Sequence, residues 1–177
     1  RPRYPLDRLI GEIVAVPGLE RVRLSSIEPM QLSRRITKLA EDCPKIAPHF
    51  HICLQSGSNE VLKRMLRPYS RERFAEIVEE IHELLPSAAI GTDVIVGFPG
   101  ETEKDHLQTI EFVKKMPFAY LHVFPYSDRQ GTLASRMKGK VSSQNINLRS
   151  QALRNLSDQK NQTFRSNFIG NQLSVVT

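Results

Sequence analysis

The sequence predicts an α/β fold built on a parallel sheet, because strand-length apolar runs alternate with amphipathic helical segments along its 177 residues. The strand-like runs are apolar almost throughout, as is typical of parallel strands that are covered on both faces. Polar side chains gather where these runs end, and ligand sites of such sheets and barrels lie at the carboxyl ends of the strands. We therefore expect about four parallel strands, right-handed crossovers and a site at one edge of the sheet.

Four segments have the length and composition of strands: 21–28, 49–55, 88–98 and 119–127. Helical periodicity or capping residues predict helices at these places: one ending near 17–20, then 31–42, a short helix after Ser58, 71–85, 102–116 and 145–168. Ser58 is the expected N-cap of the short helix, and Thr102 with Asp105 forms a capping box. Gly170 is expected to end the last helix, and residues 171–177 have strand-like composition.

Composition excludes several classes of protein. Hydrophobic residues make up 40% and charged residues 25%, as in ordinary globular proteins. There is no apolar run long enough to span a bilayer and no signal-peptide pattern, so we expect a cytoplasmic protein without a membrane partner. Cys43 and Cys53 match no metal motif and are expected to be reduced thiols. The first residue is Arg, which suggests a fragment or a processed chain.

The formal net charge of +6 is unevenly distributed. Beyond residue 128 only Asp158 opposes eight basic residues, which are Arg129, Arg136, Lys138, Lys140, Arg149, Arg154, Lys160 and Arg165. Such an excess suits a polyanion, because each neutralised phosphate releases condensed counterions. The candidate RNA contacts are Arg129, Arg136, Lys138 and Lys140. A solvated helix face that only aids solubility explains the same charges equally well.

Polar groups at the expected strand ends are the candidate site residues: Ser25, Ser26 and Glu28, then Gln55 and Ser56, then Tyr126 and Ser127. Asp93 differs from these because it lies inside a strand, on the same face as Ile95 and Gly97. A carboxylate there is costly unless hydrogen bonds or a charge satisfy it. Either a ligand or an ordinary bond to nearby backbone or to Thr92 would satisfy it.

Each of these signals has a structural alternative. Glu28 before Pro29 suits a turn, and Arg67 before Pro68 suits a surface ion pair with Glu60. The glycines of the GFPG segment, residues 97–100, suit a tight strand-to-helix turn. The residues alone therefore predict a parallel α/β domain with a polar rim, and they do not identify a reaction.

Four segments, taken in order, resemble the methylthiotransferases of the radical S-adenosylmethionine superfamily: RVRLSSIEP, HFHICLQSGSNEVLKRMLRPYS, GTDVIVGFPGETEKD and LHVFPYSDRQGT. RLSSIEP is most similar to the branch that modifies threonylcarbamoyl-adenosine beside the anticodon of tRNA. Sister branches act on isopentenyl-adenosine in tRNA or on an aspartate of a ribosomal protein. The resemblance implies a partial (β/α) barrel, with residues 1–168 as the C-terminal part of the radical domain and 169–177 as the start of a small RNA-binding β-barrel.

The resemblance also assigns cofactor contacts. It implies that Gln55 and Asp93 hold the ribose of S-adenosylmethionine, that Arg67 meets the methionine carboxylate, and that Glu28 lies beside the methionine part or the ribose. Ser56, next to Gln55, is included among these contacts. A guanidinium can grip a carboxylate with two hydrogen bonds, so the assignment to Arg67 is chemically sensible. The GFPG and VFPYS turns would offer backbone to the adenine edge.

The chain also departs from the family pattern. Cys53 stands where the family usually has Pro, and SDRQGT replaces SPRPGT. The intact enzyme needs a C-x-x-x-C-x-x-C run and three further cysteines for two [4Fe-4S] clusters, and neither set is in this chain. We therefore expect no metal ligand and no catalytic acid, base or nucleophile here, and an inactive fragment.

Two matters stay open at this stage. A basic α/β module that binds RNA without any cofactor is the alternative from another class of function. The oligomeric state is also undetermined, although the exposed edge of the first strand could pair with another chain.

Overall fold

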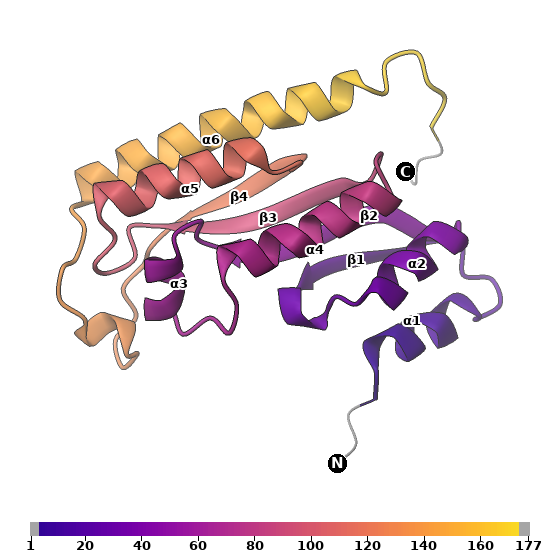
Figure 1. Cartoon of the computed structure of the whole chain (residues 1–177), viewed down its shortest axis with the longest axis horizontal. Helices are drawn as coiled ribbons and strands as arrows, with labels where there is room; N and C mark the ends of the chain where they lie inside the picture. Colours follow the sequence, from indigo (N-terminus) through magenta and orange to yellow (C-terminus); the bar gives the residue numbers. More distant parts are fainter. Residues whose placement is uncertain (1–3, 174–177) are drawn as a thin grey trace.

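The computed structural model describes residues 4–173. Its centre is one parallel four-stranded sheet in the order β1-β2-β3-β4. The strands are β1 (Val22–Ile27), β2 (Ile46–Gln55), β3 (Ala89–Val96) and β4 (Tyr120–Pro125). Each crossover leads to the neighbouring strand, so the order in space follows the order in sequence (Figure 1). The predicted α/β class and its four parallel strands are confirmed.

Six helices and two short 3-10 turns complete the described part of the chain. The helices are α1 (Leu6–Val14), α2 (Arg34–Asp42), α3 (Asn59–Arg64), α4 (Arg71–Leu84), α5 (Glu103–Lys115) and α6 (Ser143–Ser166), and the turns are η1 (Pro29–Gln31) and η2 (Ala134–Arg136). The longer helices run alongside the strands and follow one another across the sheet, from α2 through α4 and α5 to α6 (Figure 1). The described helices are not long and apolar enough to cross a membrane.

The two faces of the sheet differ in chemistry. Alternate residues of the strands bury apolar side chains under the helices, including Phe50, Ile52, Leu54, Ile90 and Val94. The residues between them point the other way, because successive side chains of a strand alternate. That second face, which we call the inner face, carries His49, His51, Cys53, Asp93, Tyr120 and His122. The inner face is therefore polar and aromatic where the helix-covered face is aliphatic.

One of the two predicted helix caps forms and the other does not. Thr102 and Asp105 form the predicted capping box at the start of α5. Ser58 precedes α3 as predicted but makes no capping hydrogen bond there. Its hydroxyl is fully buried and donates to Asp105 Oδ1 at 2.6 Å, so it joins two helix starts instead.

The predicted C-terminal features shift as well. α6 ends at Ser166, before Gly170, which adopts a positive φ of 86° in the turn that follows. Residues 171–173 have no regular secondary structure, and the rest of the strand predicted at 171–177 lies outside the described residues. The division at residue 168 therefore stays a prediction.

Candidate functional site

Irregular backbone marks the carboxyl edge of the sheet. Positive φ angles occur at three described residues other than glycine: Ser26 (54°), Leu66 (56°) and Gln55 (72°). The pairing register also shifts along β1 and at the end of β2, as at β-bulges. Bulges redirect side chains, and a left-handed residue other than glycine costs about 1–3 kcal/mol unless its surroundings enforce it. The strained backbone therefore coincides with the predicted strand-end site.

Gln55 lies at the end of β2, where its backbone is re-aimed by the register shift beside Val94. The side chain is largely buried, and its amide makes no hydrogen bond within residues 4–173. The amide atoms are not among the fully buried unpaired atoms of residues 4–173, so they reach the surface and are available to a ligand. This placement fits the role that the resemblance implies.

The turn after Gln55 is fastened to α5. The Gly57 amide donates to Thr109 Oγ1 at 3.1 Å, and a Cβ on Gly57 would lie 2.7 Å from the Thr109 Cα. Only glycine allows this approach. Ser56 is buried, and its hydroxyl contacts Thr109 Oγ1 at 3.3 Å and accepts from the Ser58 amide at 3.2 Å. The Ser56 side chain therefore holds the turn and is not one of the proposed cofactor contacts.

Arg67 reaches across to the end of the first strand. Its Nη1 donates to Glu28 Oε1 at 3.0 Å, so its partner is Glu28 and not Glu60. The side chains keep 27% and 45% of their exposure, which leaves bonding capacity on both groups. The Tyr69 hydroxyl donates to the Cys53 carbonyl at 2.8 Å and ties this segment to β2. Glu28, Gln55 and Arg67 thus belong to the carboxyl edge.

Asp93 lies just before that edge, paired in register with Cys53 on β2 and His122 on β4. Its Oδ1 lies 2.8 Å from His51 Nε2 and 3.4 Å from His122 Nδ1. Thr92 is not its partner, because Thr92 faces the helices and donates to the Ile52 carbonyl at 2.7 Å. Sequence reasoning missed both histidines as neighbours of Asp93. The alternation H-F-H-I-C at residues 49–53, which places His51 on one strand face with Cys53, was the available signal.

Cys53 donates its thiol to Asp93 Oδ2 at 3.5 Å. Burial first, and then the Asp93 carboxylate, raise the pKa of the Cys53 thiol to about 11. Cys53 is therefore a neutral donor at physiological pH, while metal ligation and nucleophilic attack need a thiolate. Both Cys43 and Cys53 are free, so the expectation of reduced thiols is consistent with the structure.

The four candidate RNA contacts Arg129, Arg136, Lys138 and Lys140 are all exposed on the connection between β4 and α6. The Gly100 amide donates to the Gly139 carbonyl at 2.8 Å, which fastens this connection to the GFPG turn at the carboxyl edge. Lys140 is already ion-paired with Asp128. The exposed charges therefore lie on the same side of the molecule as the site.

Two of the eight basic residues serve the fold instead. Arg149 is buried and pairs with Glu101 and Glu103 at 2.9 and 3.0 Å. Lys160 donates to the carbonyls of Lys114 and Met116 at 3.2 and 2.8 Å and so caps the end of α5. These two of the eight basic residues are therefore unavailable both to a polyanion and to a solvated helix face.

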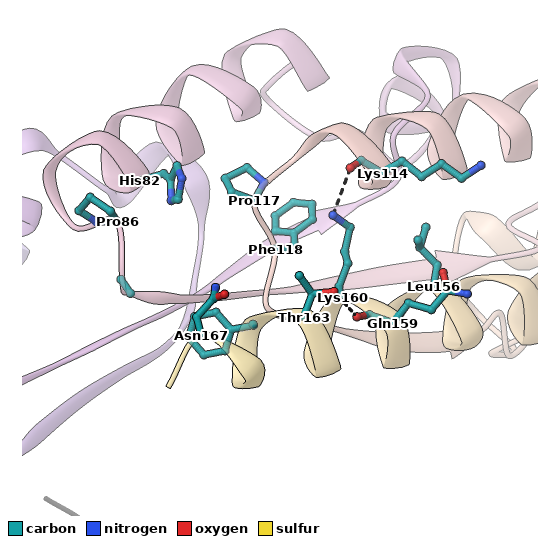
Figure 2. A pocket seen from close by; sticks show the side chains of 12 residues that line it. His82, Pro86, Lys114, Pro117, Phe118, Leu156, Gln159, Lys160, Thr163 and Asn167 are labelled. Atoms are coloured by element: carbon teal, nitrogen blue, oxygen red, sulfur yellow. Dashed lines mark hydrogen bonds between the residues drawn. The ribbon is translucent and has the colours of Figure 1, made fainter. Parts of the chain in front are cut away.

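A cavity of about 400 Å³ lies at the opposite edge of the sheet, near the amino ends of β3 and β4. Figure 2 shows Lys160 crossing it toward the end of α5, between Phe118 and Gln159. Burial lowers the pKa of Lys160, and its ammonium is occupied by the two helix carbonyls. The Lys160 ammonium is therefore used by the fold and is not free to bind a ligand in this cavity.

Comparison with known proteins agrees with this architecture. A family model described as the radical SAM superfamily matches residues 2–113. Coproporphyrinogen III oxidase from Escherichia coli, described as a radical SAM enzyme, superposes with a TM-score of 0.66 at 18% identity, over 88% of this chain and 36% of its own. This likeness shows a shared fold, so the four-stranded sheet is part of a radical SAM α/β barrel.

Sequence relatives are more specific. The chain is 44% identical to the threonylcarbamoyladenosine tRNA methylthiotransferase of Aquifex aeolicus and 42% identical to that of Bacillus subtilis, over 98% of the chain in each case. It is 37% identical to the tRNA-2-methylthio-N(6)-dimethylallyladenosine synthase of Thermobifida fusca over the same share. The alignments cover 42%, 39% and 35% of these relatives, so the chain spans about two fifths of their length. The resemblance to methylthiotransferases is confirmed, and the chain belongs to the radical SAM superfamily.

Proposed function

We propose that the chain is part of a cytoplasmic enzyme that adds a methylthio group to threonylcarbamoyladenosine in tRNA, using S-adenosylmethionine. Three relatives with this name are 40–44% identical over nearly all of the chain. Five dimethylallyladenosine synthases are 36–41% identical, so the preference for the threonylcarbamoyl branch is small and needs a direct test.

The half-exposed Arg67–Glu28 pair beside Gln55 is the observation that carries the proposal. The methionine part of S-adenosylmethionine ends in a carboxylate and an ammonium, which complement a guanidinium and a carboxylate that already lie 3.0 Å apart. Arg67 keeps further N–H donors beyond the one used by Glu28. We infer that Arg67 binds the carboxylate and that Glu28 lies beside the ammonium or the ribose.

Gln55 and Asp93 are the proposed ribose contacts. An amide and a carboxylate can together accept from, and donate to, two neighbouring hydroxyls. Gln55 has an unused amide at the strand end, and Asp93 is in register with the residue two before it on β2. Gln55 ends β2 and Asp93 lies near the end of the neighbouring strand β3, which supports their assignment to one ligand.

The superfamily implies an iron–sulfur cluster beside the cofactor. When bound, this pair supplies the radical chemistry, while the protein positions the reactants and excludes water. The cysteines of this chain do not fit such a cluster, because Cys53 is a neutral donor to Asp93 and only Cys43 remains. We propose two clusters held by other parts of the intact protein, and we assign no step to residues here beyond binding.

The exposed basic connection at residues 129–140 is the proposed tRNA contact within this chain. It lies beside the GFPG turn, so RNA bound there would approach the carboxyl edge where the cofactor is proposed to lie. Phosphate contacts of this kind position a substrate without reading its sequence.

The proposal is tested with the intact protein that contains this chain, reconstituted with iron and sulfide. Two tRNAs, one carrying threonylcarbamoyladenosine and one carrying isopentenyladenosine, are treated in parallel, and the nucleosides are identified by mass spectrometry. We expect the methylthio product only from the first. Product only from the second assigns the sister branch, and modification of a ribosomal protein assigns the third.

The non-catalytic alternative has its own test. An RNA-binding module would bind tRNA and show no affinity for S-adenosylmethionine in the intact, reconstituted protein, whereas we expect both to bind. This chain alone, given iron and sulfide, should develop no four-iron absorbance and should not cleave S-adenosylmethionine.

A further inference from the structure

A row of polar side chains crosses the inner face of the sheet behind Asp93. Three of them are linked one after another in space. The Tyr120 hydroxyl lies 3.3 Å from His51 Nδ1, and His51 Nε2 lies 2.8 Å from Asp93 Oδ1. We call Tyr120, His51 and Asp93 the inner-face row. They come from β4, β2 and β3 respectively, so the row bridges three strands on the face that the helices leave uncovered.

The direction of these hydrogen bonds follows from the end groups. A carboxylate only accepts, so His51 must carry its proton on Nε2 and donate to Asp93. In the tautomer with its proton on Nε2, His51 accepts on Nδ1, and the Tyr120 hydroxyl is the donor that it faces. Burial raises the pKa of Tyr120, which keeps this hydroxyl protonated. The row therefore has one polarity, from tyrosine to carboxylate.

His49 and Arg23 stand behind the row. His49 Nε2 lies 2.8 Å from the Tyr120 hydroxyl and 2.9 Å from Arg23 Nη2, and Arg23 Nε donates to His49 Nδ1 at 3.1 Å. Burial first, and then the Arg23 charge, lower the pKa of His49, so this histidine is neutral. His49 therefore contacts the Tyr120 end of the row, and Arg23 contacts His49.

Gly91 makes the row possible. It lies on β3, in register with His51 on one side and Tyr120 on the other. A Cβ at this position would lie 2.2 Å from the Tyr120 ring, so any side chain would displace the ring. The missing side chain thus lets Tyr120 pass over the middle strand and reach β2. A glycine inside a strand often marks such a close approach.

We propose that His51 and Tyr120 are positioning residues that orient the Asp93 carboxylate for a ribose hydroxyl of S-adenosylmethionine. His51 occupies Oδ1, so Oδ2, whose partner within residues 4–173 is the weakly donating Cys53 thiol, is the oxygen available to a ligand. His51 is almost fully buried and cannot reorient without breaking both of its bonds. The inference rests on the proposed cofactor site.

The same region contains a second chemical option. One ligand atom each of His51, Asp93 and His122 lie within 4.8 Å of one another, as in a site for a divalent cation. The direct His51–Asp93 contact favours the hydrogen-bonded row, because a protonated Nε2 cannot bind a metal. Metal binding is therefore one outcome of the test below that would overturn the inference.

The test is a titration of S-adenosylmethionine with variants of the intact, reconstituted protein. Tyr120→Phe keeps the ring and should weaken binding about fivefold, the effect of one lost neutral hydrogen bond. His51→Leu should weaken it about tenfold, while His51→Gln, which keeps a donor, should recover most of the affinity. The controls are Tyr4→Phe and His82→Gln, two exposed positions outside the row, and both should bind like wild type.

The Asp93→Asn background separates positioning from general damage. If the row acts through Asp93, then Tyr120→Phe should cause no further loss once Asp93 is Asn. Long-range nitrogen–proton NMR of labelled histidine should also find His51 in the Nε2–H form, and this form should be disturbed by Tyr120→Phe.

The outcomes point to different failures. If Asp93→Asn itself leaves the affinity unchanged, the proposed cofactor site is wrong. If Asp93→Asn weakens binding but Tyr120→Phe and His51→Leu do not, the site stands and the positioning inference is overturned. A tetrahedral Co²⁺ absorbance that is lost in His122→Ala would also overturn it, in favour of a metal site.

Discussion

Two arginine–glutamate pairs at the carboxyl edge of the sheet differ in exposure: a closed pair, Arg149 with Glu101, and an open pair, Arg67 with Glu28. Arg149 and Glu101 lie 2.9 Å apart with side chains only 9% and 2% exposed, whereas Arg67 and Glu28 lie 3.0 Å apart at 27% and 45%. The distances are nearly the same and the residue types are identical. Exposure and unused bonding capacity, not the pairing itself, separate a structural ion pair from one that can receive a ligand.

The closed pair, Arg149 and Glu101, is buried and bonded to several neighbours, although Arg149 Nε has no partner within residues 4–173. Arg149 donates to the Glu101 carboxylate, to the Glu101 carbonyl at 3.2 Å and to Glu103. Glu101 also accepts from the Gly97 amide at 2.8 Å. Burial raises the pKa of Glu101, and the Gly97 amide and Arg149 oppose that shift. This network joins the end of β3 to α5 and α6, so we expect it to act on stability.

The largest expected effect is therefore on folding. Arg149→Ala leaves Glu101 buried without its cation, and breaking a buried pair from one side costs about 3–5 kcal/mol. Urea unfolding would measure this loss. Arg154→Ala, at an exposed position of the same helix, is the control and should change stability by less than about 0.5 kcal/mol. A loss below about 1 kcal/mol for Arg149→Ala would mean that the closed pair is no more structural than the open one.

The next largest expected effect, again on stability, is at Gly97, whose amide donates to Glu101 of the closed pair. Gly97 has a φ of 80°, and an added Cβ would lie 2.4 Å from Ile146 Cγ1. Gly97→Ala combines a left-handed backbone with overpacking, so we expect a loss of about 3 kcal/mol. Gly131→Ala is matched in backbone, with a φ of 89°, but its Cβ would meet nothing within 4 Å. It should cost about 1 kcal/mol, and equal losses for both would rule out the packing component.

The open pair, Arg67 and Glu28, should affect ligand binding more than stability. Arg67→Ala should weaken S-adenosylmethionine binding about thirtyfold, or about 2 kcal/mol, the low end for a charged partner because Arg67 is partly exposed. Stability should change by less than about 1 kcal/mol, since exposed ion pairs contribute little. Gln55→Ala should cost about 1 kcal/mol of binding, as a neutral hydrogen bond does.

The control for the open pair is Arg73→Ala, which removes an exposed arginine paired with Glu76 on α4. Isothermal titration of the intact protein would compare the variants. Wild-type affinity in Arg67→Ala would reduce Arg67 to a surface residue at the end of α3 and would remove the basis of the cofactor site.

Much of this arrangement was accessible from the sequence. Continuous apolar runs predicted the parallel strands, and the capping box at Thr102 located the start of α5, because both signals are local. The strand-end positions of Glu28 and Gln55 followed from the rule that parallel strands end at one edge. The directions of their side chains could not be predicted, because the bulges and positive φ angles that redirect them depend on pairing between strands.

The partners of buried groups were harder to predict. For Asp93 the sequence left a ligand and a bond to nearby backbone or Thr92 both open, and it did not predict the side chains on β2 and β4 that contact Asp93, because strand register cannot be read from one segment. Arg149 and Lys160 were counted with a basic surface because composition does not reveal burial. Gly91 inside a strand was a usable signal for the approach of Tyr120, although it does not say which side chain fills the space.

The smallest expected effect concerns the basic connection at residues 129–140. It too contains one basic group that is free to bind a ligand and one that is already paired. Lys138 is exposed and makes no ion pair within residues 4–173, whereas Lys140 already pairs with Asp128. Lys138→Gln should weaken tRNA binding by about threefold and reduce the slope of log affinity against log salt by about one, as loss of one phosphate contact does. Lys140→Gln should weaken tRNA binding less, because part of the Lys140 charge is neutralised before RNA binds.

Lys38→Gln, at an exposed lysine of α2 paired with Glu41 and Asp42, is the control and should leave the slope unchanged. Filter binding over a series of salt concentrations would measure all three. Equal slopes for Lys138→Gln and the control would place the RNA surface elsewhere in the intact protein, while unchanged S-adenosylmethionine affinity in every variant would keep the two binding sites separate.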